Sequence, residues 1–112
     1  MSACTQINIK EGMPPTAEAL RLLETSLKRL KGLGFGCVIV IHGYGSSGRG
    51  GAICTHSRRF LKEQERKKQL RHVIYGEDFT LFNQEARGLK RLYPELDELM
   101  RVCNHGVTVV EL

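Results

Sequence analysis

A glycine-rich segment follows a run of four β-branched residues in the sequence VIVIHGYGSSGRGGAI, positions 38–53. Five of the nine residues from Gly43 to Gly51 are glycine. Glycine permits positive φ angles and lets backbone N–H groups come close to a ligand. A helix that begins near Ala52 would point its free N–H groups and its dipole into the same space. This combination predicts a site for phosphate.

The segment lacks the features of known nucleotide-binding motifs, which bears on whether the phosphate belongs to a small ligand or to a polymer. It has no Gly-Lys-Ser/Thr ending of a P-loop, and no acidic residue follows at the spacing of a Rossmann dinucleotide site. The glycines would also suit a simple tight turn, but five in nine residues exceed what such a turn requires. The segment therefore favours the phosphates of a polymer, and a small phosphorylated ligand or nucleotide is the alternative.

Basic residues are concentrated beside the glycine-rich segment. The chain has a net charge of +5, and the residues from Arg49 to Arg71 carry +6 while the rest carries −1. Such a stripe is typical of a protein that binds DNA or RNA, since a small ligand needs only about one or two cations. A solvated helix face is the structural alternative. The candidate phosphate-binding residues are Gly43, Tyr44, Gly45, Gly48, Arg49, Arg58, Arg59, Lys62 and Arg66.

Three residues are candidates for catalysis. His42 ends the apolar run and can donate to a phosphate or act as an acid or base near neutral pH, although a single histidine is often structural. Glu77 and Asp78 follow a second apolar run, and adjacent carboxylates can hold Mg²⁺ together with a substrate phosphate. Asp78 also suits a turn or a helix cap. Tyr44 can stack on an unpaired base or pin the loop to the core.

The hydrophobic pattern predicts the elements that position these residues. Strands are expected at 7–9, 37–41, 72–75 and 107–110, a helix between Thr16 and Gly32, a basic amphipathic helix beginning near Ala52, and two shorter helices at 80–92 and 94–103. This order predicts a single α/β domain spanning residues 1–112, a two-layer α/β sandwich with a four-stranded mixed sheet. Ligands of open α/β sheets bind beyond the carboxyl ends of the strands, where the glycine-rich segment is expected to lie.

Composition excludes several classes of protein. Apolar residues make up 41% of the chain, and no apolar run approaches the roughly 18 residues of a membrane span. The N-terminus has neither the basic start nor the apolar region of a signal peptide, so a cytoplasmic protein without membrane contact is expected. The four cysteines show no C-x-x-C spacing, which disfavours a zinc site or a disulfide framework.

The segment IHGYGSSGRGGAI resembles the H-G-x-G-x-G signature of the Smr (small MutS-related) domain family. The terminal HGVTVVEL is similar to the closing G-x-T-x-V-x-L strand of that family, and INIKEGMPPTAEAL occupies the place of its opening segment. The resemblance implies a fold like the C-terminal domain of bacterial translation initiation factor three, binding of DNA or RNA, and in some members nicking or endoribonuclease activity. His42, Gly43, Gly45 and Gly48 match the central motif, with an extra serine in the spacing.

Two departures from the family pattern affect the expected activity. Where the first strand of the family usually has Asp, then Leu, then His or Arg, this chain has Asn8, Ile9 and Lys10. An amide cannot act as a general base or hold a metal as a carboxylate does. Any nicking endonuclease activity is therefore expected to be weak or absent, and to need His42 with Glu77 or Asp78. The segment 76–104 is also longer than the usual spacer before the last strand.

Overall fold

Strands and helices alternate along the described part of the chain, which comprises residues 3–43, 48–102 and 104–112 of the computed structural model, with residues 48–50 described by their backbone alone. The strands are β1 (Cys4–Asn8), β2 (Cys37–Ile41), β3 (His72–Tyr75) and β4 (Val107–Glu111). The helices are α1 (Thr16–Gly32), α2 (Gly48–Arg66), α3 (Gln84–Leu92) and α4 (Asp97–Val102), with short 3₁₀ helices η1 (Gly76–Asp78) and η2 (Pro94–Leu96). The predicted order of elements is confirmed.

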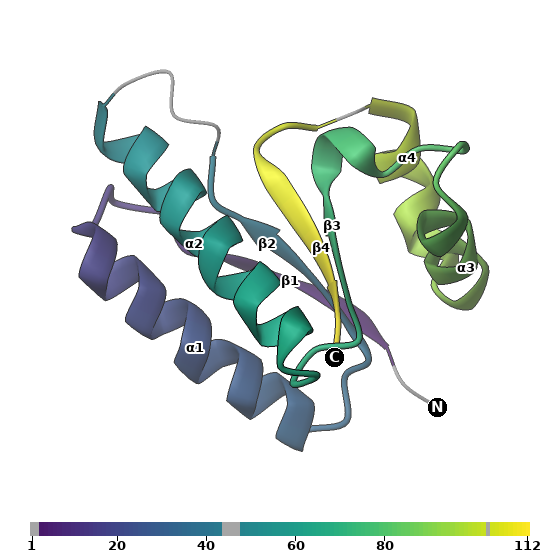
Figure 1. Ribbon diagram of the computed structural model, residues 1–112, viewed down its shortest axis with the longest axis horizontal. Coiled ribbons are helices and arrows are strands. Elements are labelled where there is room, and N and C mark those ends of the chain that lie inside the picture. Colours follow the sequence, from purple (N-terminus) through teal and green to yellow (C-terminus); the bar gives the residue numbers. More distant parts are fainter. Residues whose placement is uncertain (1–2, 44–47, 103) are drawn as a thin grey trace.

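The four strands form one mixed sheet in the order β1-β2-β4-β3. β1 runs parallel to β2, and β4 runs antiparallel to both β2 and β3. The carboxyl ends of β1, β2 and β3 therefore lie at one edge of the sheet, beside the beginning of β4 (Figure 1). The predicted α/β fold with a four-stranded mixed sheet is confirmed.

One face of the sheet packs against α1 and α2. Leu23, Leu27 and Leu30 recur at helical spacing and are buried, so this stripe of α1 faces the sheet. The inward face of α2 was predicted correctly, because Ile53, Ser57 and Leu61 are fully buried. Valines on alternate positions of the strands complete this core, namely Val38, Val40, Val73 and Val110.

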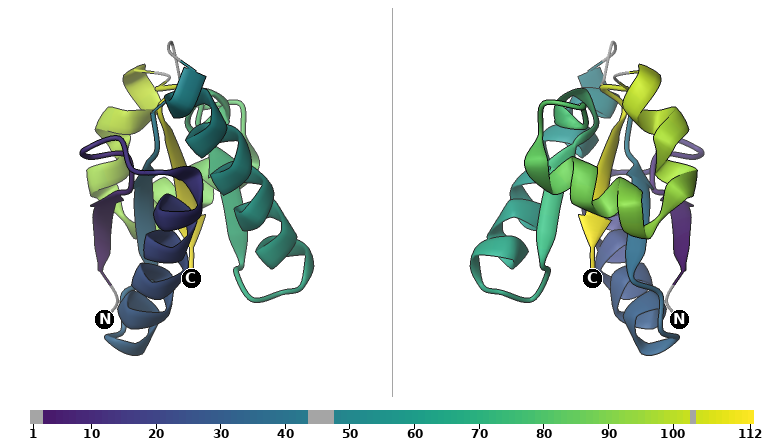
Figure 2. Two further views of the ribbon diagram at one scale, coloured as in Figure 1. Left: turned by 90° about the vertical axis from the view of Figure 1, so that its left-hand side faces the viewer. Right: turned by 90° about the vertical axis from the view of Figure 1, so that its right-hand side faces the viewer.

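The other face of the sheet is covered by the segment between β3 and β4. Its core residues are Phe79, Ala86, Leu89, Tyr93, Leu96 and Met100, which pack against Cys37, Ile74 and Val109 of the sheet. Figure 2 shows α1 and α2 in front of the sheet in one view and α3 and α4 in front of it in the other. The sheet with α1 and α2 forms the expected sandwich, and the long 76–104 segment adds a helical layer to the opposite face.

Several element boundaries differ from the sequence-based prediction. The first strand spans Cys4–Asn8 and not 7–9, and the helix expected at 94–103 is divided into η2 and α4. α3 begins at Gln84 and not at residue 80, because the Asn83 side chain accepts a hydrogen bond from the Ala86 N–H (3.0 Å) and so caps the helix. α2 begins at Gly48, four residues before Ala52, although glycine is a poor helix former. Within the described ranges, no helix is long and apolar enough to cross a membrane.

Candidate functional site

The predicted site residues gather where the strands end. His42 and Gly43 follow β2, and Glu77 follows β3. Lys10, which was not a predicted site residue, follows β1. The carbonyl of Gly106, just before β4, accepts hydrogen bonds from the N–H groups of both His42 (3.1 Å) and Gly43 (3.0 Å). These bonds attach the start of the glycine-rich segment to the closing strand. The carboxyl ends of three parallel strands and the start of the antiparallel strand β4 thus converge on one site.

His42 is fully buried and has partners at both ring nitrogens. Nδ1 lies 2.6 Å from the Gly43 carbonyl, which can only accept, so Nδ1 carries the proton. In the neutral ring Nε2 is then an acceptor, and it lies 2.8 Å from the hydroxyl of Thr108. Burial lowers the pKa of His42; the Gly43 carbonyl opposes this shift and the nearby Arg58 charge adds to it. His42 is therefore neutral at pH 7 and directed into the protein.

Arg58 of α2 is the centre of the same network. Its Nη1 and Nη2 donate to the two carboxylate oxygens of Glu77 at 2.7 and 2.6 Å, a bidentate ion pair. Its Nε lies 3.2 Å from the Thr108 hydroxyl, and Nη2 also reaches the carbonyls of His105 (3.2 Å) and Val107 (3.1 Å). The Arg58 side chain is only 14% exposed. We call His42, Arg58, Glu77 and Thr108 the strand-end cluster.

Electrostatics keep this ion pair charged. Arg58 holds the pKa of Glu77 below its usual range, although partial burial opposes the shift. Burial is the largest single effect and lowers the pKa of Arg58, but the hydrogen bonds to Glu77 and the electrostatic interactions with Cys54, Glu77 and Tyr75 together raise that pKa above its usual value. The guanidinium also lies 4.2 Å from the ring centroid of Tyr75, at cation–π distance. The pair joins α2 to the end of β3.

The alternation of side chains along the strands explains why these residues meet. Thr108 is paired with Val40 on one side and with Tyr75 on the other, so all three side chains point to the face covered by α2. His42 lies two residues beyond Val40 and points the same way. Thr108 and Tyr75 were not predicted as site residues. A polar residue within an apolar strand was the available signal for Thr108.

Gly76 permits the close approach of β3 to the start of β4. A Cβ atom at this position would lie 1.8 Å from the carbonyl oxygen of Asn104 and 2.9 Å from that of Val107. No other residue type fits without moving the backbone. Glycine here brings the following Glu77 within reach of Arg58. Gly76 was also missed from the sequence, where its place between a strand and an acidic pair was the only hint.

Asp78 does not join the strand-end cluster. It is exposed, and its backbone carbonyl accepts a hydrogen bond from the Asn83 side chain (3.1 Å), as expected of a turn residue. Among the described side chains, no three His, Cys, Asp or Glu residues are placed to hold a metal ion together. Arg58 binds both oxygens of Glu77, an interaction that would compete with the Mg²⁺ site considered from the sequence.

The basic residues of α2 fall into two groups. The Lys62 Nζ donates to the Val73 carbonyl (2.9 Å), and Glu65 accepts from the Val73 N–H (2.7 Å), so both satisfy the outer edge of β3. Arg59 and Arg66 are exposed, and Arg66 pairs with Glu63 on the helix surface. We call Arg59 and Arg66 the exposed basic face.

The glycine-rich segment is only partly described. Tyr44, Gly45 and the side chain of Arg49 lie outside the described residues, and Gly48 is the first residue of α2. Gly43 has a φ of 73°, and a Cβ there would lie 2.9 Å from the Cδ of Lys10. Positive φ at the first glycine of the motif agrees with the expected role of glycine in turning the chain.

Asn8 shapes the turn that places Lys10 against the glycine-rich segment. Its Oδ1 accepts hydrogen bonds from the N–H groups of Lys10 and Glu11, both at 3.0 Å. The oxygen of the side chain therefore stabilises the bend after β1. Lys10 was noted in the sequence only as a departure from the family pattern, and the structure adds it as a cation beside Gly43.

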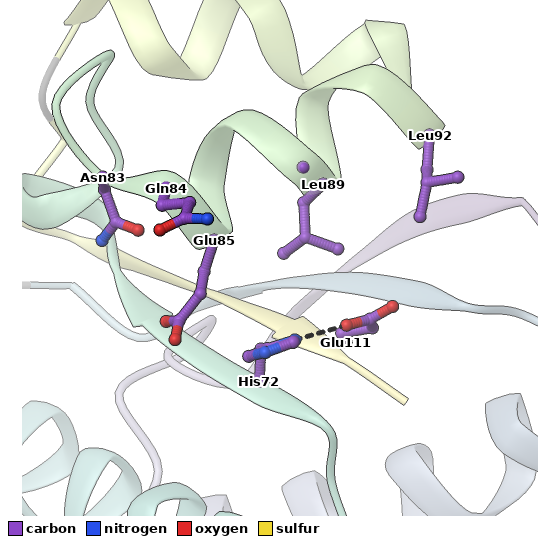
Figure 3. A pocket seen from close by; sticks show the side chains of 8 residues that line it. His72, Asn83, Gln84, Glu85, Leu89, Leu92 and Glu111 are labelled. Carbon is purple, nitrogen blue, oxygen red and sulfur yellow. Dashed lines mark hydrogen bonds and ion pairs between the residues drawn. The ribbon is translucent and has the colours of Figure 1, made fainter.

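A groove lies at the other end of the strands, away from the strand-end cluster. Its volume is about 770 Å³, and it is lined by His72, Asn83, Gln84, Glu85, Gly88, Leu89, Leu92 and Glu111. Figure 3 shows the hydrogen bond between His72 Nδ1 and Glu111 Oε1 (2.6 Å), which joins β3 to β4. None of the predicted site residues lines this groove. Its carboxylates, Glu85 and Glu111, disfavour a phosphorylated ligand in this groove.

Comparison with known protein families finds a match to the part of the chain that contains most of the strand-end cluster. A family model described as the Smr domain matches residues 12–78, a range that contains the glycine-rich segment, α2, β3 and Glu77. Neither curated proteins nor solved structures include a significant match to the chain. Smr domains generally bind nucleic acid and resemble nicking endonucleases. Since the match covers more than half of the sequence, the chain belongs to the Smr domain family.

Proposed function

We propose that this Smr domain holds the backbone phosphates of DNA or RNA with its glycine-rich segment and with the exposed basic face of α2. The observation that carries the proposal is the +6 charge of residues 49–71, with Arg59 and Arg66 exposed on the helix that follows the glycines. Cations that neutralise phosphates release counterions, which supplies most of the affinity of such sites. We further propose that residues 1–112 act as one Smr-like domain, since β1 and β4 complete its sheet.

The strand-end cluster is assigned a positioning role in this proposal. Arg58 and Lys62 add to the positive field of α2, while their head groups bind within the protein. His42 holds the end of β2 to β4 through Thr108, so the following glycines leave the sheet in a fixed direction. Gly43, Gly45, Gly48 and Arg49 then contact phosphate, and Tyr44 contacts a base.

Cleavage of the nucleic acid is proposed to be weak. A general base needs a free acceptor near the attacking group, whereas Nε2 of His42 is engaged by Thr108. Glu77 is held by Arg58, and the family's acidic position is Asn8. Any nicking therefore requires rearrangement of the cluster or use of Asp78.

The binding proposal is tested by fluorescence anisotropy with labelled single-stranded DNA, duplex DNA and single-stranded RNA over a range of salt concentrations. Arg59→Glu/Arg66→Glu should weaken binding and reduce the slope of log affinity against log salt by about 2. The matched control is Arg91→Glu/Arg101→Glu, which changes the same charge on α3 and α4, with one surface ion pair lost in each double variant. Equal effects of the two double variants would show that only net charge matters.

A further inference from the structure

The segment between η1 and α3 presents an apolar tip to solvent. Phe82 is 95% exposed and Leu81 is 60% exposed, whereas Phe79, three residues earlier, is completely buried. The tip lies beyond the residues matched by the family model, which end at position 78. Exposure of two consecutive large apolar side chains to water is unfavourable. It indicates that these side chains contact another molecule.

Hydrogen bonds hold the tip in its exposed position. The Thr80 hydroxyl accepts from the Phe82 N–H (3.3 Å), and the Thr80 carbonyl accepts from the Asn83 N–H (3.1 Å). The Arg87 guanidinium donates to the Leu81 carbonyl (2.8 Å). Local polar groups thus engage the Leu81 carbonyl and the Phe82 N–H of the tip. Phe82 is presented by an ordered turn, which limits the entropy lost when a ligand covers it.

The tip adjoins the strand-end cluster. An open depression of about 490 Å³ is lined by Glu77, Asp78, Thr80, Phe82 and Asn83. Glu77 is the carboxylate that pairs with Arg58 of α2. In Figure 1 the segment after η1 lies at the same end of the molecule as the carboxyl ends of β2 and β3. A ligand bound along the strand ends can therefore extend to Phe82.

The charges in the depression indicate which part of a nucleic acid fits there. Glu77 is paired with Arg58, but the exposed carboxylate of Asp78 would repel a phosphate, so the backbone must pass elsewhere. A base is uncharged, carries N–H donors that carboxylates accept, and has a flat face that stacks on an aromatic ring. In a continuous duplex the base faces are already stacked, which leaves only an unpaired base free to cover Phe82.

We propose that Phe82 stacks on an unpaired base of the bound nucleic acid, with Leu81 as an apolar flank. This base-stacking site rests on the proposed function. It gives the protein a preference for single strands and for duplexes with an unpaired base over continuous duplex. The phosphates of the same molecule lie on the exposed basic face and the glycine-rich segment.

The test uses 2-aminopurine, a fluorescent base analogue, within a single-stranded oligonucleotide, and anisotropy of an end-labelled strand in parallel. On binding the wild-type protein, stacking should change the 2-aminopurine emission. Phe82→Ala should remove that change and weaken single-strand binding by about 10-fold, while affinity for continuous duplex stays the same. Phe82→Trp should restore both signals, because tryptophan also stacks. The control, Leu33→Ala, removes an apolar side chain that is 65% exposed at the end of α1 and should have no effect.

The outcomes separate the two proposals. If wild type binds and Phe82→Ala leaves the 2-aminopurine signal and the single-strand affinity unchanged, the base-stacking site is wrong and phosphate binding stands. An equal loss on single strand and duplex would also overturn it, since the contact would not involve an unpaired base. Absence of any binding by the wild-type protein would overturn both.

Discussion

Arg58 and Arg59 are adjacent on α2, but their environments have little in common. The donors of Arg58 are taken up by a carboxylate, a hydroxyl and two carbonyls of the strand ends, whereas Arg59 is exposed to solvent. The strand-end cluster is thus a largely buried polar network that fixes the backbone, and the exposed basic face supplies accessible charge. The contrast shows that a stripe of positive charge in a sequence contains residues with two different physical roles.

The largest effect on stability is expected from replacing Gly76, which lets the end of β3 approach the start of β4 beside the strand-end cluster. Gly76→Ala would place a Cβ on the Asn104 carbonyl and force β3 away from β4. We expect a loss of about 3 kcal/mol or more in the free energy of unfolding, measured by urea denaturation. Gly88→Ala on α3 is the control, because a Cβ there meets nothing within 4 Å and alanine favours a helix. A small effect of Gly76→Ala would mean that the strand ends readily adjust.

The next effect separates the two arginines directly. Arg58→Ala should lower the free energy of unfolding by about 2 kcal/mol, because carbonyls and the half-buried Glu77 lose a charged partner. Arg59→Ala should change it by no more than about 0.5 kcal/mol and should instead weaken nucleic-acid binding and its salt dependence. Equal stability losses in the two variants would remove the distinction between cluster and exposed face.

Local pattern predicted much of the fold. The strands at 37–41 and 72–75 were predicted correctly because short apolar runs bounded by turns are typical of buried strands. The buried face of α2 was predicted from the helical spacing of its apolar residues. The start of α3 was missed because the Asn83 side chain ends the preceding turn and caps the helix. Thr80 and Asn83 are both residue types that can cap a helix, and the sequence alone does not show which of them does so.

The strand-end cluster was predictable only as a set of separate residues. His42, Arg58 and Glu77 were all singled out, but their mutual contacts depend on the pairing of β3 with β4. That pairing sets Thr108 between Val40 and Tyr75, and the contact at Gly76 is a close approach between distant parts of the chain. Neither leaves a periodic signal in the sequence, and charge type alone cannot tell a buried arginine from an exposed one.

A smaller effect concerns pH. Burial lowers the pKa of His42 below its ordinary value of 6.5. Between the pKa of the folded state and that of the unfolded state, the unfolded chain therefore binds more protons than the folded one. The stability due to neutral His42 is complete above about pH 6.5 and is lost as the pH falls toward the lowered pKa of the folded state. His42→Gln removes this titration, so its stability deficit relative to wild type should shrink by up to about 1 kcal/mol per pH unit on acidification.

Urea denaturation at several pH values between about 7.5 and 5.5 measures the difference. His56→Gln makes the same substitution at an exposed histidine of α2 and is the control for replacing a histidine outside the strand-end cluster. A deficit of His42→Gln that does not vary with pH would show that the buried ring does not resist protonation, and that the cluster opens easily enough to admit a charge.

The smallest effect tests on which side of the comparison Lys62 belongs. Its Nζ bonds to the Val73 carbonyl and lies 5.1 Å from the ring centroid of Tyr75, but its side chain is partly open to water. Lys62→Met keeps the aliphatic stem and removes the charge, and since water can replace Nζ we expect a loss of only about 0.5–1 kcal/mol in the free energy of unfolding. If Lys62 serves the edge of β3, the salt slope of nucleic-acid binding should stay unchanged, while Arg59→Met lowers it by about 1. A slope that falls equally in both variants would mean that Lys62 leaves Val73 to bind phosphate, and the exposed basic face would then extend along α2 to the edge of the sheet.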